Sequence, residues 1–139
     1  MPSPKKLTRD KPAAKDTFET GLGIRRDMFG PAGAEQQIAA ATKFTAPMQD
    51  LVTRYCFGEI WDRPHLDRKT RSLLTIAILA SLGKSPQLKT HVRGAVTNGA
   101  SMQEIREVLL HTMIYAGVPA GVEGFVNAAE VLKDLGLDQ

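Results

Sequence analysis

Helix signals recur along the chain from residue 17 to residue 134, and they constrain the fold more than any other feature. Apolar side chains repeat at three- and four-residue spacing, and capping residues or glycines separate the repeats. No convincing alternating strand or hairpin signal interrupts them. The pattern therefore predicts an all-α fold, a compact bundle of six to seven helices. We expect these helices at 17–29, 33–43, 46–57, 68–82, 86–97, 102–116 and 119–134.

Four local signals set the predicted helix boundaries. Asp67 is an N-cap candidate for the helix that follows it. Ser85-Pro86 resembles an N-cap followed by proline at the first helical position. Ser101 and Glu104 have the spacing of a capping box, in which each side chain satisfies a free backbone donor of the other. The segment GEIWDRPH, residues 58–65, is expected to break the third helix.

The basic character of the chain comes from its first residues. Residues 1–16 hold five basic and two acidic side chains, whereas 17–139 hold 13 of each, so the pI of 9.2 reflects the tail. We interpret 1–16 as a disordered basic tail and 17–139 as the domain. A nucleic-acid-binding domain would carry its own basic face, so no nucleic-acid partner is expected.

Composition excludes several other classes. One cysteine, Cys56, cannot form an internal disulfide framework, a CxxC pair or a cysteine-based zinc site. No apolar run is long enough to span a bilayer, and the first residues lack a secretory apolar stretch. We therefore expect a cytoplasmic protein without a membrane partner. P-loop, GxGxxG, GxSxG and HExxH motifs are missing from the sequence. We therefore expect neither a metal ion nor a cofactor.

The candidate site residues are titratable groups beside apolar positions. His91 and His111 each border the apolar face of a helix, and Tyr115 follows His111 by one turn. Glu59 lies between Phe57 and Trp61, a setting that suits a general acid or base. Each histidine taken alone is more often structural, and Glu59 could equally pair with a nearby arginine. Arg71 and Arg93 suit carboxylate binding, although an ion pair between helices is the competing explanation.

Together these elements resemble the carboxymuconolactone decarboxylase family. The resemblance runs from about Phe18 to Leu135, and RYCFGEIW, LDRKTRSLLT, LKTHVRGAVTNG and EVLLH–IYAGVPA carry it. It implies an alkyl hydroperoxidase D-like helical fold and a homo-oligomer, a trimer or hexamer. It also implies a cofactor-independent carboxy-lyase that converts 4-carboxymuconolactone, a small dicarboxylate lactone, to 3-oxoadipate enol-lactone in the β-ketoadipate pathway.

The peroxidase branch of the same superfamily uses CxxCxxxH and an upstream glutamate. Aligned on His91, the two cysteine positions hold Lys84 and Gln87, and the glutamate position holds Ser72. Thiolate attack followed by disulfide formation needs both cysteines. Thiol peroxidase activity is therefore disfavoured, and Cys56 is expected to pack as a small apolar residue.

The resemblance assigns roles to the candidates. His91, the position shared with the peroxidases, is the expected proton donor or oxyanion-stabilising group, and Glu59 is a second acid/base candidate. Arg93 or Arg71 would bind carboxylate, while His111, Tyr115 and Trp61 would line the substrate pocket. Two alternatives stay open: a decarboxylase or isomerase of a related small carboxylated lactone, and a non-catalytic oligomeric binding protein on the same fold.

Overall fold

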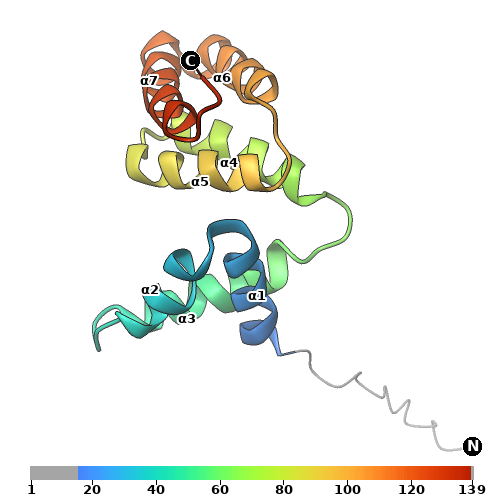
Figure 1. The fold of residues 1–139 in the computed structure, drawn as a ribbon, viewed down its shortest axis with the longest axis vertical. Coiled ribbons are helices and arrows are strands. Elements are labelled where there is room, and N and C mark those ends of the chain that lie inside the picture. Colours follow the sequence, from blue (N-terminus) through green and yellow to red (C-terminus); the bar gives the residue numbers. More distant parts are fainter. Residues whose placement is uncertain (1–15, 139) are drawn as a thin grey trace, which may run out of the picture.

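The computed structural model describes residues 16–138, and within them the all-α prediction is confirmed. The chain forms seven α-helices there, with no strand among the described residues (Figure 1). In chain order the elements are α1 (Thr17–Phe29), a 3-10 turn η1 (Pro31–Gly33), α2 (Glu35–Ala39), α3 (Ala46–Leu51), a π-helix η2 (Val52–Ile60), α4 (Arg68–Ser81), α5 (Ser85–Thr97), α6 (Met102–Ala116) and α7 (Val118–Asp134).

The predicted basic tail lies outside the described residues, apart from its last member. Asp16 is the N-cap of α1, because its carboxylate accepts hydrogen bonds from the backbone N–H groups of Phe18 and Glu19, at 3.0 and 3.4 Å. The described residues thus begin at the N-cap of α1, and the division between tail and domain stays a prediction.

Most predicted caps are confirmed. The Asp67 carboxylate accepts from the Thr70 N–H at 2.7 Å, and Ser101 and Glu104 form the reciprocal capping box at 3.0 and 3.1 Å. The prediction for Ser85 is wrong in detail: Ser85 is the first residue of α5 and Lys84 is its N-cap. The Ser85 hydroxyl instead lies 2.5 Å from a Glu123 carboxylate oxygen on α7.

The second and third predicted helices differ from the structure. The Ala-rich segment forms only the short α2, which is preceded by η1 at Pro31. The third helix does not break at Gly58, because it widens into the π-helix η2 and continues to Ile60. The Trp61 N–H closes this segment by donating to the Cys56 carbonyl at 3.0 Å, a five-residue step. π-helical turns often occur at functional sites.

The helices form two layers with separate cores (Figure 1). Helices α4–α7 surround one core that includes Ile76, Val92 and Leu109. Helix α1 packs on η2 around a second core, made of Ile24, Met28, Phe57 and Trp61. The layers are joined along the chain by residues 61–67, and α1 contacts α5 where they meet.

Two glycines allow α1 and η2 to lie in backbone contact. A Cβ atom built on Gly21 would collide with the Thr53 carbonyl oxygen, and one built on Gly58 would collide with the Thr17 carbonyl oxygen. No larger residue fits at either position without separating the helices. This close approach sets the position of Phe57, which η2 turns toward the junction of the two layers.

Candidate active site

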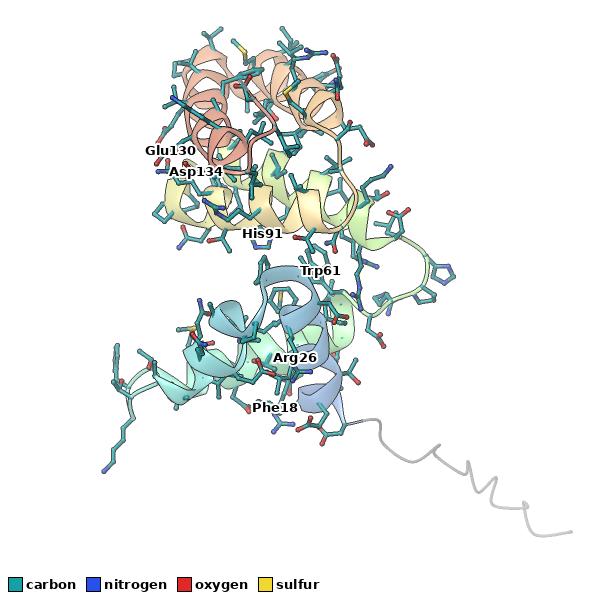
Figure 2. All side chains as sticks on the ribbon, viewed as in Figure 1. Phe18, Arg26, Trp61, His91, Glu130 and Asp134 are labelled. Atoms are coloured by element: carbon teal, nitrogen blue, oxygen red, sulfur yellow. The ribbon has the colours of Figure 1, made fainter. Side chains whose placement is uncertain are left out.

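His91 lies on α5 at the junction of the two layers. Figure 2 shows its ring below α5, on the side of the N-terminal layer, with Trp61 close by. The ring nitrogen Nδ1 is buried and has no hydrogen-bond partner among the described residues. A buried polar atom left without a partner costs about 1–3 kcal/mol, so such an atom calls for an explanation.

Aromatic rings surround His91. The rings of His91 and Phe29 are nearly perpendicular, at a centroid distance of 5.4 Å and an interplanar angle of 86°. Trp61 is stacked with His91 at 6.3 Å and 28°. Phe57 contacts both partners, at 5.9 Å from Phe29 and 5.7 Å from Trp61. Phe29, Phe57 and Trp61 therefore form an apolar aromatic cluster that lies against His91.

This environment fixes the charge of the imidazole. Burial lowers the pKa of His91 to about 4, because the charged form loses hydration that nothing nearby replaces. At neutral pH the His91 ring is consequently neutral. A neutral imidazole donates one hydrogen bond and accepts another, but it holds no readily transferable proton.

A cavity of about 370 Å³ opens beside the ring. This volume is within the range of small-molecule sites. Its walls come from α1, η1, α2, α3, η2 and α5, and thus from both layers. The lining residues are Arg25, Phe29, Gly33, Gln37, Met48, Gln49, Val52, Phe57, Pro86, Gln87, Thr90 and His91, and we call this space the His91 cavity.

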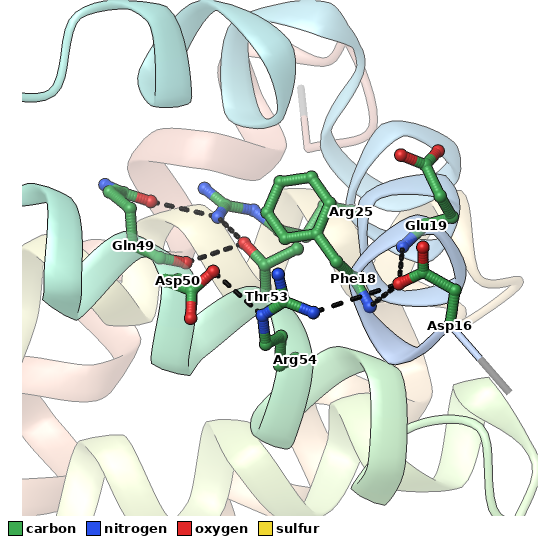
Figure 3. Close-up of polar contacts among 8 residues, drawn as sticks. All are labelled: Asp16, Phe18, Glu19, Arg25, Gln49, Asp50, Thr53 and Arg54. Atoms are coloured by element: carbon green, nitrogen blue, oxygen red, sulfur yellow. Dashed lines mark hydrogen bonds and ion pairs between the residues drawn. The ribbon is translucent and has the colours of Figure 1, made fainter. Parts of the chain in front are cut away.

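Arg25 is the functional candidate that sequence reasoning missed. This residue of α1 is only 3% exposed, although it lines the His91 cavity. Its Nη1 donates to Gln49 and to Thr53, both at 2.9 Å (Figure 3). Helical spacing offered a signal, because Arg25 lies four residues after Gly21 on the buried face of α1.

Glu59 and Arg71 do not join His91 in the described chain. Glu59 is exposed on η2 and does not line the His91 cavity, so its acid/base role stays a prediction. Arg71 is half-buried in the first turn of α4, and its Nη2 donates to the Arg63 carbonyl at 3.3 Å. Its Nε is buried without a partner among residues 16–138.

Arg93 borders a different cavity. This space, here called the Arg93 cavity, has a volume of about 610 Å³ and lies between α1, α5 and α7. Arg93 is paired with Asp134 at 3.1 Å, and Lys89 is paired with Glu130 at 2.8 Å. Arg26 completes the basic residues of the lining and is paired with Glu35. The arginines of neighbouring sequence positions, Arg25 and Arg26, therefore line different cavities.

His111 and Tyr115 form a third location on α6. Their rings stack at 4.7 Å, and both residues are exposed. His111 lines a separate cavity of about 390 Å³ between α4 and α6. The structure thus brings Trp61 and His91 together, while the predicted pocket roles of His111 and Tyr115 stay predictions.

The positions equivalent to the peroxidase relay carry other chemistry. Ser72 is fully buried and accepts a hydrogen bond from Asn98 Nδ2 at 2.9 Å. Lys84 and Gln87 are exposed, and Gln87 lines the His91 cavity. Cys56 is exposed on η2, so the prediction that it packs as a small apolar residue is wrong.

Neither a metal cluster nor a membrane helix is found in the described part of the chain. Residues 16–138 contain no group of three or more histidine, cysteine, aspartate or glutamate side chains placed to hold a metal ion. Among the same residues, no helix has both the length and the apolar character required to cross a membrane.

Comparison with known proteins identifies the family. The model of the carboxymuconolactone decarboxylase family matches residues 46–132. The 4-carboxymuconolactone decarboxylase of Acinetobacter baylyi is 38% identical over 120 residues, which cover 86% of this chain and 90% of that protein. The nitrosuccinic acid decarboxylase of Metarhizium robertsii is 38% identical over 118 residues, 85% of this chain and 82% of that protein. Both relatives are decarboxylases, which supports the carboxy-lyase class predicted above. The chain belongs to the carboxymuconolactone decarboxylase family.

Proposed function

We propose that this protein decarboxylates 4-carboxymuconolactone to 3-oxoadipate enol-lactone, in the cytoplasm and without a cofactor, as a step in protocatechuate breakdown. The observation that carries the proposal is the His91 cavity, where a neutral, partly unpartnered imidazole borders an aromatic wall. The similarity to the Acinetobacter enzyme named for this substrate supports it.

The reaction defines what such a site must supply. The departing carboxylate is carried by the saturated ring carbon next to a carbon–carbon double bond, which is conjugated with the lactone carbonyl. When the bond to CO2 breaks, its electron pair spreads through this double bond onto the carbonyl oxygen as a dienolate, and solvent water then delivers a proton to the ring carbon. The substrate is its own electron sink. The protein needs to stabilise the developing oxyanion and to bind a doubly negative molecule.

His91 is suited to the oxyanion. In its neutral form the ring can direct one N–H toward the lactone oxygen, and the hydrogen bond strengthens as negative charge develops. The low pKa of His91 argues against a resting imidazolium as the proton source. Of the two roles that the sequence leaves open for His91, oxyanion stabilisation therefore has the better physical support.

The aromatic wall is suited to the departing carboxylate. Phe29 and Phe57, the aromatic residues that line the His91 cavity, offer this group no charge and little hydration, and its charge disappears as CO2 leaves. An apolar surface therefore disfavours the ground state more than the transition state. A cation at the same place would have the opposite effect.

A second candidate reaction is the decarboxylation of nitrosuccinate. It is favoured by the Metarhizium relative, which has the same identity to this chain as the Acinetobacter enzyme. Nitrosuccinate is also a dicarboxylate, and its nitro group can accept the electron pair left by CO2. Both substrates need the same two elements, an oxyanion donor and a place for the retained carboxylate.

We also propose that the protein acts as a homo-oligomer. Apolar side chains 49–64% exposed repeat every four residues along α4 and at its C-cap, at Leu74, Ile78 and Leu82. A similar exposed stripe follows α7. Exposed apolar stripes of this kind favour association. Light scattering should give a mass that is a multiple of 15.1 kDa. Ile78→Lys should reduce this mass, Gln103→Lys should not, and a wild-type monomer would contradict the proposal.

The test of function uses metal-free purified protein with each substrate, following ultraviolet absorbance and CO2 release together. Rapid turnover of 4-carboxymuconolactone that chelator does not affect is expected. Turnover of nitrosuccinate alone would transfer the assignment to the second reaction. A folded protein that turns over neither would favour the open alternatives, a related lactone or a binding protein.

A further inference from the structure

Arg25 carries a buried positive charge that the described chain does not neutralise. Its four hydrogen bonds all go to neutral acceptors: the Gly33 carbonyl at 3.0 Å, Gln37 at 2.8 Å, and Gln49 and Thr53 at 2.9 Å. Among residues 16–138, no aspartate or glutamate forms an ion pair with it. Burying a charge without a counter-charge destabilises the fold, and a fully buried arginine almost always has a paired acidic group.

The hydrogen bonds also leave one donor free. A guanidinium has five N–H groups, and four of those on Arg25 are used. The fifth is on Nη2, the atom that also binds Gln37. The side-chain oxygens of Gln37 and Gln49 face Arg25, so each amide NH2 is left as a further donor, and both glutamines line the His91 cavity.

Arg25 and His91 reach the same cavity from opposite layers. Arg25 lies over the Phe57 ring at 6.0 Å, and His91 meets Phe29 at 5.4 Å. The two phenylalanines are themselves in contact at 5.9 Å. One aromatic pair thus separates a fixed cation from a neutral hydrogen-bond donor, within a space of about 370 Å³.

We propose that Arg25, supported by Gln37 and Gln49, binds the carboxylate that the substrate retains. The proposal rests on the proposed decarboxylase function and deepens it. The retained carboxylate is the better partner, because a cation on the departing carboxylate would hold the charge that the reaction must remove. An anchor at Arg25 places the rest of the molecule along Phe57 and toward His91, which orients the leaving group against the aromatic wall.

A structural role is the competing explanation, since Arg25 also ties α1 to η1, α2, α3 and η2. Gln49→Glu separates the two roles. It gives the guanidinium an internal carboxylate at a position where it already donates a hydrogen bond, so the fold should be as stable as the wild type or more so. The same carboxylate neutralises the cation and should prevent anion binding.

The direct probe is succinate, a dicarboxylate that does not react. We expect it to raise the unfolding temperature of the wild type and to bind measurably by calorimetry, whereas uncharged succinamide does neither. Arg25→Gln and Gln49→Glu should weaken succinate binding at least tenfold, and Arg25→Lys should weaken it less. Arg26→Gln is the matched control at the next residue, which is exposed and paired with Glu35, and it should bind succinate like the wild type.

In turnover, Arg25→Gln should raise KM by tenfold to a hundredfold, with a smaller change in kcat. Unchanged succinate affinity and KM in folded Arg25→Gln, or unchanged succinate affinity in folded Gln49→Glu, would overturn the proposal. The two claims fail separately: Arg25-dependent succinate binding without decarboxylation contradicts the proposed function only, and decarboxylation that is indifferent to Gln49→Glu contradicts the anchor only.

Discussion

The His91 cavity and the Arg93 cavity are neighbours that differ in how their charged residues are paired. They share Phe29, Gly33, Gln37 and Thr90, and both are built on α1 and α5. The Arg93 cavity is the larger and has more charged residues, yet its basic side chains are all ion-paired, and Arg26 and Arg93 are exposed. The His91 cavity has a single arginine, which is buried without a counter-ion in the described chain, and a half-buried, neutral histidine.

We infer from this difference that the pairing of charged residues, and not their number, indicates which of the two cavities binds substrate. In an exposed ion pair each charge already has a partner, and the pair contributes only about 0–1 kcal/mol to the stability of the fold. A buried cation and an unpartnered imidazole nitrogen both lower the free energy of unfolding. A ligand that supplies the missing partner groups would remove this penalty. The smaller cavity is therefore where substrate chemistry is expected, and four predictions test this comparison.

The largest effect is expected from His91→Ala. Loss of an oxyanion donor should lower kcat by at least ~10²-fold. His91→Gln should recover part of this loss if the role is hydrogen-bond donation, and none if His91 transfers a proton. Thr97→Ala, on the same helix but in the Arg93 cavity, is the control. A loss below tenfold in folded His91→Ala would remove His91 from the mechanism.

The next effect concerns the wall of the His91 cavity. Gly21→Ala should destabilise the fold by about 3 kcal/mol, because the new methyl group collides with the Thr53 carbonyl and separates α1 from η2. Gly23→Ala, two residues later on the same helix, meets nothing within 4 Å. It should stabilise α1 by about 0.5–1 kcal/mol. Equal stabilities in urea denaturation would disprove the backbone contact.

Acid should destabilise the protein through the His91 cavity. The pKa of His91 is about 4 in the folded protein and 6.5 in the unfolded chain, so between these values the unfolded chain binds more protons. The stability is therefore full above pH 6.5 and declines as pH falls toward 4, by on the order of 3 kcal/mol. Urea unfolding of His91→Gln across this range should lack that contribution. Parallel pH profiles of the variant and the wild type would contradict the buried neutral ring.

The smallest effect is expected from Arg93→Gln. Removing its exposed ion pair with Asp134 should cost less than about 1 kcal/mol and change kcat/KM by less than about twofold. Steady-state kinetics and thermal unfolding measure both. A tenfold rise in KM would instead support the substrate-binding role predicted for Arg93 from the sequence and would break the comparison of the two cavities.

The sequence predicted the parts of the fold that local signals control. Asp67 and Ser101 mark the first turns of two helices, and the structure confirms both as N-caps. The π-helix was missed because widening to a five-residue step depends on packing against α1. Helical periodicity cannot separate it from an α-helix, which is why the predicted break at Gly58 was wrong.

The candidate site was only partly predictable, for a related reason. His91 could be selected because it borders the apolar face of its helix and because the family resemblance shares this position with the peroxidases, and Trp61 because the resemblance implies a pocket role for it. Arg25 and Arg93 look alike in the sequence. Only tertiary contacts decide that one is buried among neutral acceptors while the other meets Asp134 at the surface.

A succinate titration followed by nitrogen-15 NMR of the histidine rings and the arginine side chains shows directly which cavity binds the ligand. We expect saturable shifts of the His91 ring and the Arg25 Nε–H signals, with the Arg93 Nε–H signal unmoved. Shifts confined to Arg93 and Lys89, or an unmoved His91 and Arg25 at saturating succinate, would contradict the claim that the smaller, unpaired cavity is the substrate site.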